Sequence, residues 1–371
     1  MTAINKLASR LLAAGILGCL ALPGTASADA MQDQLAAAAA EAGSPALAAG
    51  IITSETIEVR VSGVRRLGSP ARVAIDDAFH IGSDAKAMLA TLIAQEVEIG
   101  RLRWDSTLGD VLPDVAAGAR EEYRNVTLAD LLSHRAGLIP LYTLEDLQRV
   151  PPLSGNVRAQ RAQFTAWVLR QPPAFPPGTA AAYSNAGYVV AAAMLERVTG
   201  RSYEELLQRR LLAPLGIRAT FGWPAEIDRN APWGHELNGT GLRPVDPRDP
   251  DSRIPQWANP AGNVSMSVRD FARFVRLHLR GLRGDCALLQ PGTFERLHTP
   301  DGEYAFGWAV ADLNGRVVSF HQGASGLFYA LMIIDAANDV AAVVLANSDT
   351  EEMAMVATRL ALQLMASKVQ L

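Results

Sequence analysis

The segments of this chain that resemble β-strands lie at its two ends, and this distribution limits the possible folds more than any other feature. Near the amino terminus, residues 46–63 form two apolar stretches around a polar turn, and residues 78–81 add a short third one. Similar stretches recur near the carboxyl terminus, at 304–310, 317–322, 330–334 and 340–345. Their alternation and tight polar turns are typical of antiparallel pairing. The sequence therefore predicts an α+β fold with one antiparallel sheet built from both chain ends.

The residues between these two groups have a different character. Helical patterns alternate there with loops rich in proline and glycine, as at 172–178 and 214–216, and with a polar stretch at 238–255. Helices are expected at 84–99, 127–133, 158–169, 186–198, 203–211, 268–279 and 351–366. We therefore expect residues 29–100 and 265–371 to form a discontinuous α/β sheet domain flanked by helices. Residues 101–264 are expected to form an inserted all-helical domain.

The first 28 residues predict a secretory signal peptide. Lys6 and Arg10 precede an apolar run that ends at the small residues Ala26-Ser27-Ala28, which places the expected cleavage after Ala28. Lipoprotein processing before Cys19 is an alternative, but the apolar residues 20–22 behind it argue against that site. A membrane anchor is also disfavoured, because the apolar run is short and contains glycines. We therefore expect a periplasmic or secreted protein.

Cysteine content and charge exclude several classes of protein. Without the leader only Cys286 remains, so a disulfide within the chain, a cysteine-rich zinc site and a thiolate nucleophile are not expected. Cys286 is interpreted as a small buried or loop residue. The formal charge is −4, and removal of Lys6 and Arg10 with the leader makes it −6. Nucleic-acid binding favours a basic face, so a nucleic-acid partner is not expected.

The stretch HIGSDAKAMLA, residues 80–90, contains a candidate nucleophile and base. Lys86 is one of only three lysines, with Lys6 and Lys368, among 34 basic residues. Arginine serves as a soluble charge but cannot lose its proton, whereas a shielded lysine can act as a base. Ser83 lies three residues earlier, so both side chains share one face of a helix. In the alternative interpretation, Gly82-Ser83 is a helix-opening turn and Lys86 extends to solvent.

Two further segments are candidates for a site, and each also has a structural interpretation. Tyr183-Ser184-Asn185 follows the turn at 176–178 and precedes an apolar helix, so Tyr183 is either a proton relay or a core anchor beside a helix cap. The segment from His321 to Gly326 ends a strand with small residues. It is either a close-approach edge for a substrate, with the Ala324 N–H facing an oxyanion, or a glycine-rich hairpin.

Taken together, the three segments resemble the motifs of the penicillin-recognising serine hydrolases. This family includes class C β-lactamases, D-alanyl-D-alanine carboxypeptidases, and related esterases and aminopeptidases. Ser83-x-x-Lys86, Tyr183-Ser-Asn185 and His321-Gln-Gly323 occur in the family's order. Supporting stretches are similar as well, among them VTLADLLSHRAGL at 126–138, NPAGNVSMSVRDFARF at 259–274 and YAFGW at 304–308. The resemblance covers nearly the whole chain after residue 28.

The resemblance implies a role for each matched residue. Ser83 would attack a carbonyl group and form an acyl-enzyme, and Lys86 would accept its proton. Tyr183 would pass a proton to the leaving group or activate water, while Asn185 would orient the substrate and Lys86. Binding of the substrate would involve, besides Asn185, the residues His321, Gly323, Ala324 and Asn347, with Asn347 near a substrate carboxylate. The resemblance implies no metal or organic cofactor, a peptide or small-molecule partner and a monomer, and it makes His134 structural.

The third motif departs from the Lys-Thr-Gly usual in β-lactamases. His321 replaces the lysine, as in peptidase members and general hydrolases of this fold, and Gln322 replaces a small hydroxyl residue. Both changes weaken the expectation of efficient β-lactam hydrolysis. The expected function is hydrolysis of D-amino-acid peptides or their β-lactam mimics. The alternatives are an esterase of the same fold and a non-catalytic protein that binds cell-wall peptides.

Overall fold

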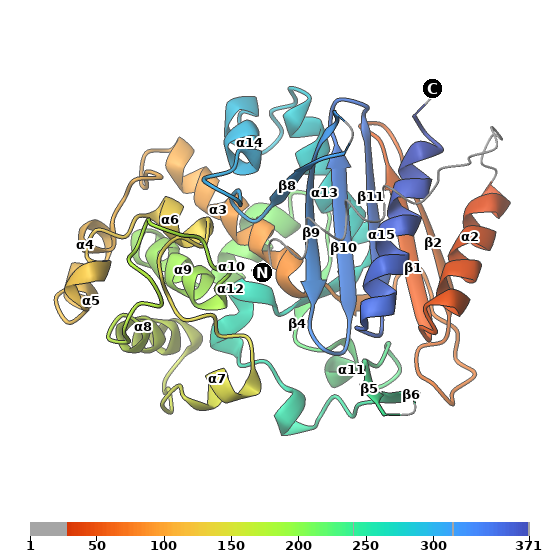
Figure 1. Cartoon of the computed structure of the whole chain (residues 1–371), viewed down its shortest axis with the longest axis horizontal. Coiled ribbons are helices and arrows are strands. Elements are labelled where there is room, and N and C mark those ends of the chain that lie inside the picture. Colours follow the sequence, from red (N-terminus) through yellow and green to blue (C-terminus); the bar gives the residue numbers. More distant parts are fainter. Residues whose placement is uncertain (1–27, 240, 314, 370–371) are drawn as a thin grey trace.

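The computed structural model of this chain describes residues 28–239, 241–313 and 315–369 (Figure 1). The predicted signal peptide lies outside the described residues except for Ala28. In the part of the chain that the structure describes, no helix is long and apolar enough to cross a membrane.

One six-stranded antiparallel sheet joins the two ends of the chain, as the sequence predicts. Its strand order is β2-β1-β11-β10-β9-β8, and Leu47 of β1 pairs with Ala346 of β11. The amino-terminal strands therefore form one edge and β8 forms the other. The bounds are β1 (Ala46–Ile52), β2 (Ile57–Gly63), β8 (Ala309–Asp312), β9 (Val317–Ala324), β10 (Tyr329–Asp335) and β11 (Val340–Ala346).

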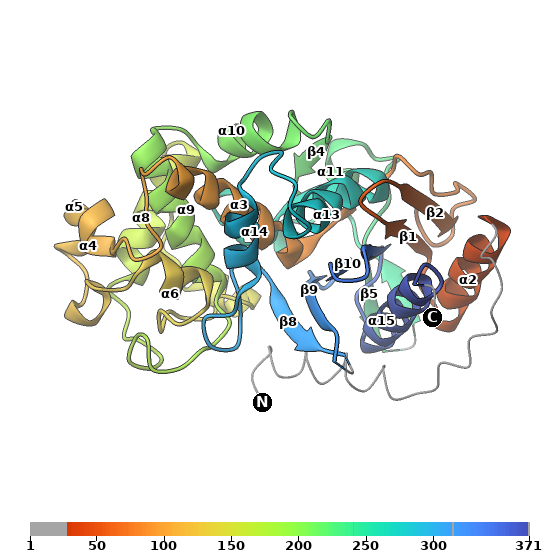
Figure 2. The same cartoon turned by 90° about the horizontal axis from the view of Figure 1, so that it is seen from above.

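Helices cover both faces of this sheet (Figure 2). On one face lie α2 (Ala28–Glu41) and α15 (Glu351–Ala366), which enclose an apolar cluster with that face. On the other face lies α13 (Val268–Leu282), and α3 (Ala85–Glu98) runs between the sheet and the inserted helices. A second, larger apolar cluster fills this side. The start of α3 is thereby held where the sheet meets the inserted helices.

The inserted stretch is mainly helical, with short strands that the sequence did not reveal. Of these strands, β4 (Ala219–Phe221) joins β3 (Ala78–His80) and β7 (Val264–Ser267) in a small sheet, and β5 (His235–Asn238) pairs with β6 (Gly241–Pro244). The helices there are α4 (Leu108–Val111), α5 (Pro113–Ala116), α6 (Leu128–Leu132), α7 (Leu144–Gln148), α8 (Val157–Val168), α9 (Asn185–Thr199), α10 (Tyr203–Leu207), α11 (Pro224–Ile227) and α12 (Asn259–Gly262). The chain then continues through α13 and α14 (Pro291–His298) to the carboxyl-terminal strands.

The strand expected at 304–310 is displaced toward the carboxyl terminus, because β8 begins only at Ala309. The cause is contact with α3. Gly307 has a φ of +84°, and a methyl group on it would lie 2.6 Å from the Cα of Ala87. The backbone therefore turns at Gly307 to fit against α3, which an alternating pattern does not reveal. Cys286 lies in the loop after α13 and is exposed rather than buried.

Candidate active site

Ser83 and Lys86 lie where the chain turns from β3 into α3. A single 3₁₀ turn, Gly82–Asp84, carries Ser83, and Lys86 sits in the first turn of α3. Lys86 is fully buried, whereas Ser83 is partly exposed. The Lys86 Nζ lies 2.9 Å from the Ser83 Oγ. The three-residue spacing thus brings the two side chains together, and the alternative in which Lys86 extends to solvent is wrong.

The Lys86 amine has three polar partners, and their chemistry differs. Besides Ser83, Nζ lies 2.7 Å from Asn185 Oδ1 and 2.5 Å from the Ala261 carbonyl oxygen. An amide or carbonyl oxygen can only accept hydrogen bonds, whereas a serine hydroxyl can also donate. A neutral amine has two N–H groups, which these two oxygens accept. Its lone pair is then left for the Ser83 hydroxyl.

Burial favours this neutral form of the base. Removal from water lowers the pKa of Lys86 well below its ordinary value, although the Asp84 carboxylate opposes the shift. The Asn185 amide is oriented independently, because its Nδ2 donates to the Leu141 carbonyl oxygen at 2.9 Å and so directs Oδ1 toward Lys86. A neutral amine in this position can accept the Ser83 proton directly, without first losing a proton to water.

Tyr183 lies beside both groups. Lys86 Nζ is 4.8 Å from the centre of the Tyr183 ring. Burial raises the pKa of Tyr183 well above its ordinary value, and a hydrogen bond with the Ser83 side chain opposes the shift only in part. Tyr183 therefore stays protonated at neutral pH and can donate a proton. Directly after it, Ser184 caps α9 by accepting from Gly187 N, so the helix-cap interpretation of this segment also holds.

His134 supports Tyr183 from behind. Its buried ring lies 4.3 Å from the Tyr183 ring, and its Nδ1 accepts a hydrogen bond from Ser184 N at 3.1 Å. Burial first, and then the nearby Lys86 and His321, lower the pKa of His134 well below its ordinary value. The lowered pKa favours a neutral ring, and its packing against Tyr183 is consistent with the structural role that the resemblance implies.

Two glycines bring the Ser83 turn against the end of β9. A methyl group on Gly323 would lie 1.9 Å from the Ile81 carbonyl oxygen, and one on Gly82 would lie 3.2 Å from Ala324 N. Strand β8 pairs with β9 only from Val317 to Phe320, so the turn packs against the β9 edge beyond that pairing. Gly323 and Ala324 are therefore beside Ser83, where backbone N–H groups can face an oxyanion.

His321 forms a pair with Asp84 that the sequence does not reveal. His321 Nδ1 lies 2.9 Å from Asp84 Oδ1, and both side chains are buried. Burial raises the pKa of Asp84, an effect that the hydrogen bond to His321 opposes. Within the described residues, His321 Nε2 has no hydrogen-bond partner. The pair fixes the imidazole through Nδ1, and Nε2, which is itself buried, is left without a partner.

Asn347 is placed differently from the expectation. It is fully buried, its Oδ1 accepts from Ala46 N at 2.8 Å, and its Nδ2 lies 3.3 Å from the Arg65 carbonyl oxygen. These contacts join β11 to β1 and to the chain after β2. The amide is therefore occupied by the backbone, and the role beside a substrate carboxylate is withdrawn.

Gln322 points away from His321, because successive residues of a strand face opposite sides of the sheet. It pairs with Leu331, which lies in the apolar cluster under α2 and α15. Gln322 is almost fully buried, and no partner for its Nε2 is found among the described residues. Its side chain therefore points toward the apolar cluster under α2 and α15, on the opposite face of the sheet from the His321–Asp84 pair.

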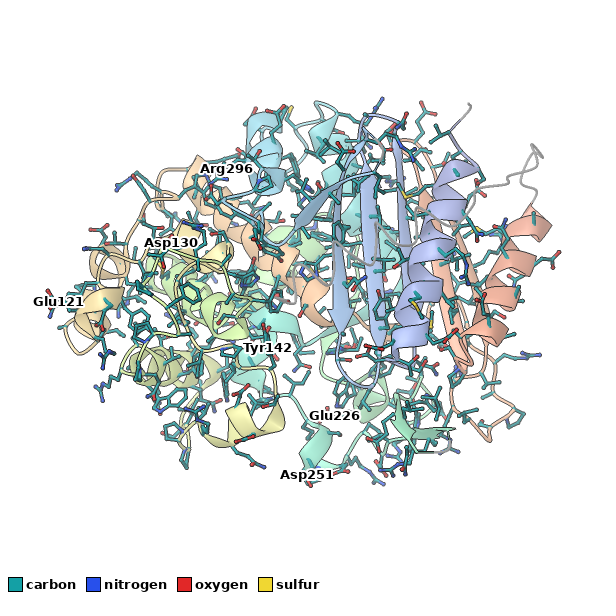
Figure 3. All side chains as sticks on the ribbon, viewed as in Figure 1. Glu121, Asp130, Tyr142, Glu226, Asp251 and Arg296 are labelled. Atoms are coloured by element: carbon teal, nitrogen blue, oxygen red, sulfur yellow. The ribbon has the colours of Figure 1, made fainter. Side chains whose placement is uncertain are left out.

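Sequence reasoning missed three groups at this site. The Ala261 carbonyl is a backbone group, so no side-chain motif marks it. Asp84 is far in sequence from its partner His321, so only the folded structure shows their contact. Tyr142 lies between the inserted helices and the sheet (Figure 3), and its hydroxyl donates to the Tyr183 carbonyl oxygen at 2.5 Å. An exposed tyrosine in a loop carries no signal of this contact. In the described ranges, no group of three or more His, Cys, Asp or Glu side chains could hold a metal ion.

Comparison with known proteins identifies relatives of this architecture. A family model described as Beta-lactamase matches residues 29–366. Penicillin-binding protein 4 of Amycolatopsis lactamdurans is 30% identical over 316 residues, which cover 82% of this chain and 81% of that protein. A solved beta-lactamase from Sulfitobacter sp. EE-36 superposes with a TM-score of 0.72 at 21% identity, over 91% of this chain and 98% of that one. SurE crystallised with D-Leu gives a TM-score of 0.72 at 23% identity, over 92% of this chain and 75% of that one.

Proposed function

Because this chain belongs to the beta-lactamase family, we propose that it is a serine hydrolase that forms an acyl-enzyme on Ser83. The observation that carries the proposal is the environment of Lys86. Two of its three partners, Asn185 Oδ1 and the Ala261 carbonyl oxygen, can only accept, so in the neutral form that burial favours the amine lone pair is left for the Ser83 hydroxyl. This is the geometry of a nucleophile with its base.

In the first step, Ser83 Oγ attacks the substrate carbonyl carbon while its proton moves to Lys86 Nζ. The carbonyl oxygen takes up negative charge, which the N–H groups of Ser83 and Ala324 would stabilise. Loss of one such donor typically costs ~10² to 10³ in rate. The approach of Gly323 and Gly82 supports this role, because it brings the two backbone segments together without side chains between them.

In the second step, the bond from the carbonyl carbon to the leaving group breaks. Tyr183, which remains protonated, gives its proton to the leaving nitrogen or oxygen and regains one from the Lys86 ammonium. Water then attacks the carbonyl carbon of the Ser83 ester while Lys86 takes its proton. The bond from that carbon to Ser83 Oγ breaks, Lys86 returns the proton to Oγ, and the acid leaves. No proton is gained or lost over the cycle beyond those of the water.

We propose D-amino-acid peptides or their β-lactam mimics as the substrates, in an exported protein. The penicillin-binding relative and the neighbour crystallised with D-Leu support this class. An esterase is the second candidate, since His321 stands where a lysine is usual in β-lactamases. A purely binding protein would have no need for a neutral buried lysine.

The deciding experiment is intact-protein mass after incubation with a fluorescent penicillin, with free penicillin followed in parallel. We expect the purified protein to gain one penicillin mass and Ser83→Ala to gain none. A stable adduct indicates slow deacylation, as in a peptidase. Consumption of the penicillin without an adduct indicates a β-lactamase.

If the penicillin stays intact, p-nitrophenyl esters and D-aminoacyl p-nitroanilides are the next substrates. Ester turnover that depends on Ser83 would favour the esterase. Equal turnover by the wild-type protein and Ser83→Ala on every substrate would contradict the proposed nucleophile. Binding without any turnover would favour the wall-peptide-binding alternative.

A further inference from the structure

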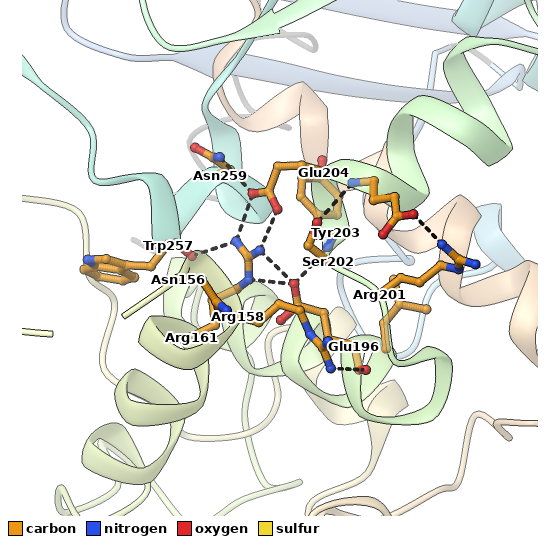
Figure 4. Close-up of polar contacts among 12 residues, drawn as sticks. Asn156, Arg158, Arg161, Glu196, Arg201, Ser202, Tyr203, Glu204, Trp257 and Asn259 are labelled. Carbon is orange, nitrogen blue, oxygen red and sulfur yellow. Dashed lines mark hydrogen bonds and ion pairs between the residues drawn. The ribbon is translucent and has the colours of Figure 1, made fainter. Parts of the chain in front are cut away.

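A buried ion pair anchors a hydrogen-bonded network in the inserted helices (Figure 4). Arg161 of α8 is fully buried, and its Nη2 lies 2.7 Å from Glu196 Oε1 and 2.7 Å from Glu204 Oε2. One guanidinium thus faces two carboxylates, so the carboxylates need further donors. Asn259 Nδ2 supplies one to Glu204 Oε1 at 2.9 Å. Asn259 is the first residue of α12, so the network reaches the segment that holds Lys86.

From Asn259 the hydrogen bonds continue without a break to the Ser83 turn. Asn263 Nδ2 lies 2.8 Å from Asn259 Oδ1, and His80 Nε2 lies 3.3 Å from Asn263 Oδ1. Gly82 N completes the series by donating to His80 Nδ1 at 3.2 Å. The series runs from α12 in the inserted helices through β3 to the residue before the nucleophile.

The direction of each bond follows from its two ends. Gly82 N can only donate, so His80 Nδ1 accepts and His80 Nε2 carries the ring proton. A carboxylate can only accept, so the Asn259 amide must present its nitrogen to Glu204. Burial lowers the pKa of His80 to about 4, which keeps the ring neutral near pH 7. Every donor and acceptor between Gly82 and Glu204 is therefore matched, and both asparagine amides have one allowed orientation.

The segment held between these two asparagines touches both members of the catalytic pair. Its Ala261 carbonyl oxygen accepts from Lys86 Nζ. A methyl group on Gly262, the next residue, would lie 3.2 Å from Ser83 N. A shift of α12 would therefore move one of the two acceptors that direct the Lys86 lone pair toward Ser83.

We propose that Asn259 and Asn263 are positioning residues, which fix α12 to Glu204 and to His80 so that the Ala261 carbonyl orients Lys86. This inference rests on the proposed function, in which Lys86 is the base for Ser83. The asparagines touch no substrate and act only through the Ala261 carbonyl and the Gly82 N–H. The inserted helices thereby help to set the reactivity of the serine in the turn before α3.

The test is the rate of Ser83 labelling by a fluorophosphonate, measured by intact mass from pH 5 to pH 10. The Ser83 oxygen bonds to phosphorus, fluoride leaves and Lys86 takes the proton, so no knowledge of the natural substrate is needed. We expect Asn259→Ala to lower the plateau rate constant on the order of 10-fold to 100-fold, because misplacement by about 1 Å can cost that much. We also expect the acid limb to move to lower pH, because the Lys86 ammonium loses an acceptor that favours it.

Asn263→Ala breaks the next bond of the network and should give the same two changes. Glu196→Gln is the matched control, since it perturbs the same Arg161 but has no bond to α12. We expect it to lower the midpoint of thermal unfolding and to leave both the labelling rate constant and the acid limb unchanged. A partly unfolded variant loses labelling amplitude, whereas the rate constant of its folded fraction is still measured.

The outcomes separate this inference from the proposed function. Wild-type protein that takes no label on Ser83 refutes the proposed function, and the inference falls with it. If the wild-type protein is labelled, and Asn259→Ala and Asn263→Ala keep its rate constant and acid limb, the inference alone is wrong. A slower rate with an unmoved acid limb would also overturn it, because the effect would not pass through Lys86.

Discussion

At the scale of single residues, the proposed function depends on a lysine whose burial disfavours the charged form. Lys86 is buried, its pKa is lowered, and in its neutral form the two oxygens that accept its N–H groups leave the lone pair to Ser83. Arginine supplies nearly every other positive charge of the chain. Since arginine keeps its proton in proteins, it could not perform this role. The identity of this one residue therefore follows from proton chemistry and not from charge.

Lys86→Arg should lower the rate of Ser83 acylation about 10²-fold to 10⁴-fold, the usual contribution of a general base. The residual rate should also lose the acid limb, because arginine does not titrate in the measured range. Lys368→Arg is the matched control, as Lys368 is exposed and paired with Glu58. Stopped-flow labelling across pH gives both quantities. A Lys86→Arg variant with the wild-type limb would show that another group is the base.

At the scale of elements, the site depends on how closely the Ser83 turn approaches β9 and how closely α3 approaches the chain before β8. Gly82, Gly307 and Gly323 all lie where a side chain would collide with backbone atoms. Backbone cannot move aside as the end of a flexible side chain can, so glycine is required at these contacts. The close approach brings Ala324 beside the Ser83 turn.

Gly323→Ala should therefore affect both stability and rate. The added methyl group would lie 1.9 Å from the Ile81 carbonyl oxygen, so we expect a loss of about 1–3 kcal/mol in the free energy of unfolding. Displacement of the Ala324 N–H should lower the rate of Ser83 acylation about 10²-fold to 10³-fold. Gly292→Ala in α14 is the control, since its methyl group would meet nothing within 4 Å. Denaturant unfolding and labelling kinetics test the two effects, and a wild-type rate for Gly323→Ala would exclude Ala324 from oxyanion binding.

At the scale of the whole molecule, neutral histidines are buried between the sheet and the helices. On the far side of α3, His278 of α13 lies 2.9 Å from His298 of α14 and 3.1 Å from Thr91 of α3. Burial lowers the pKa of His278 to about 3 and that of His80 to about 4. These rings join separate elements of the fold, and each is stable there only without its second proton.

The fold should consequently lose stability in mild acid. In the unfolded chain these histidines titrate near 6.5, so below that pH the unfolded state binds their protons first. The stability due to each neutral ring is complete above pH 6.5 and is lost as pH falls toward the folded pKa. We expect a loss of about 2 kcal/mol for each such histidine between pH 6.5 and pH 5.

Urea unfolding at pH 7 and pH 5 measures this loss directly. His278→Gln keeps polar groups at the position but does not titrate. The difference in the free energy of unfolding between pH 7 and pH 5 should therefore shrink by about the contribution of one histidine. An unchanged difference would mean that His278 is not among the groups that take up protons on unfolding.

The sequence by itself determined those features that depend on neighbouring residues. Strand and helix patterns are local, so the sheet from both chain ends and the long helices other than α2 could be predicted. The spacing of Ser83 and Lys86 is fixed by the helical turn, and Tyr183 and His321 lie in recognisable short motifs. These are properties of a few consecutive side chains, which the backbone period converts into a shared face.

Only the tertiary structure decided which distant groups meet. Asp84 and His321 are 237 positions apart, and Lys86 is 175 positions from the Ala261 carbonyl. The amide of Asn347 is taken by β1, and the strand expected at 304–310 is displaced by contact with α3. Each outcome depends on the packing of elements that are separate in the chain. A pattern of neighbouring residues carries no information about such partners, because burial and hydrogen bonding select them only once the fold is complete.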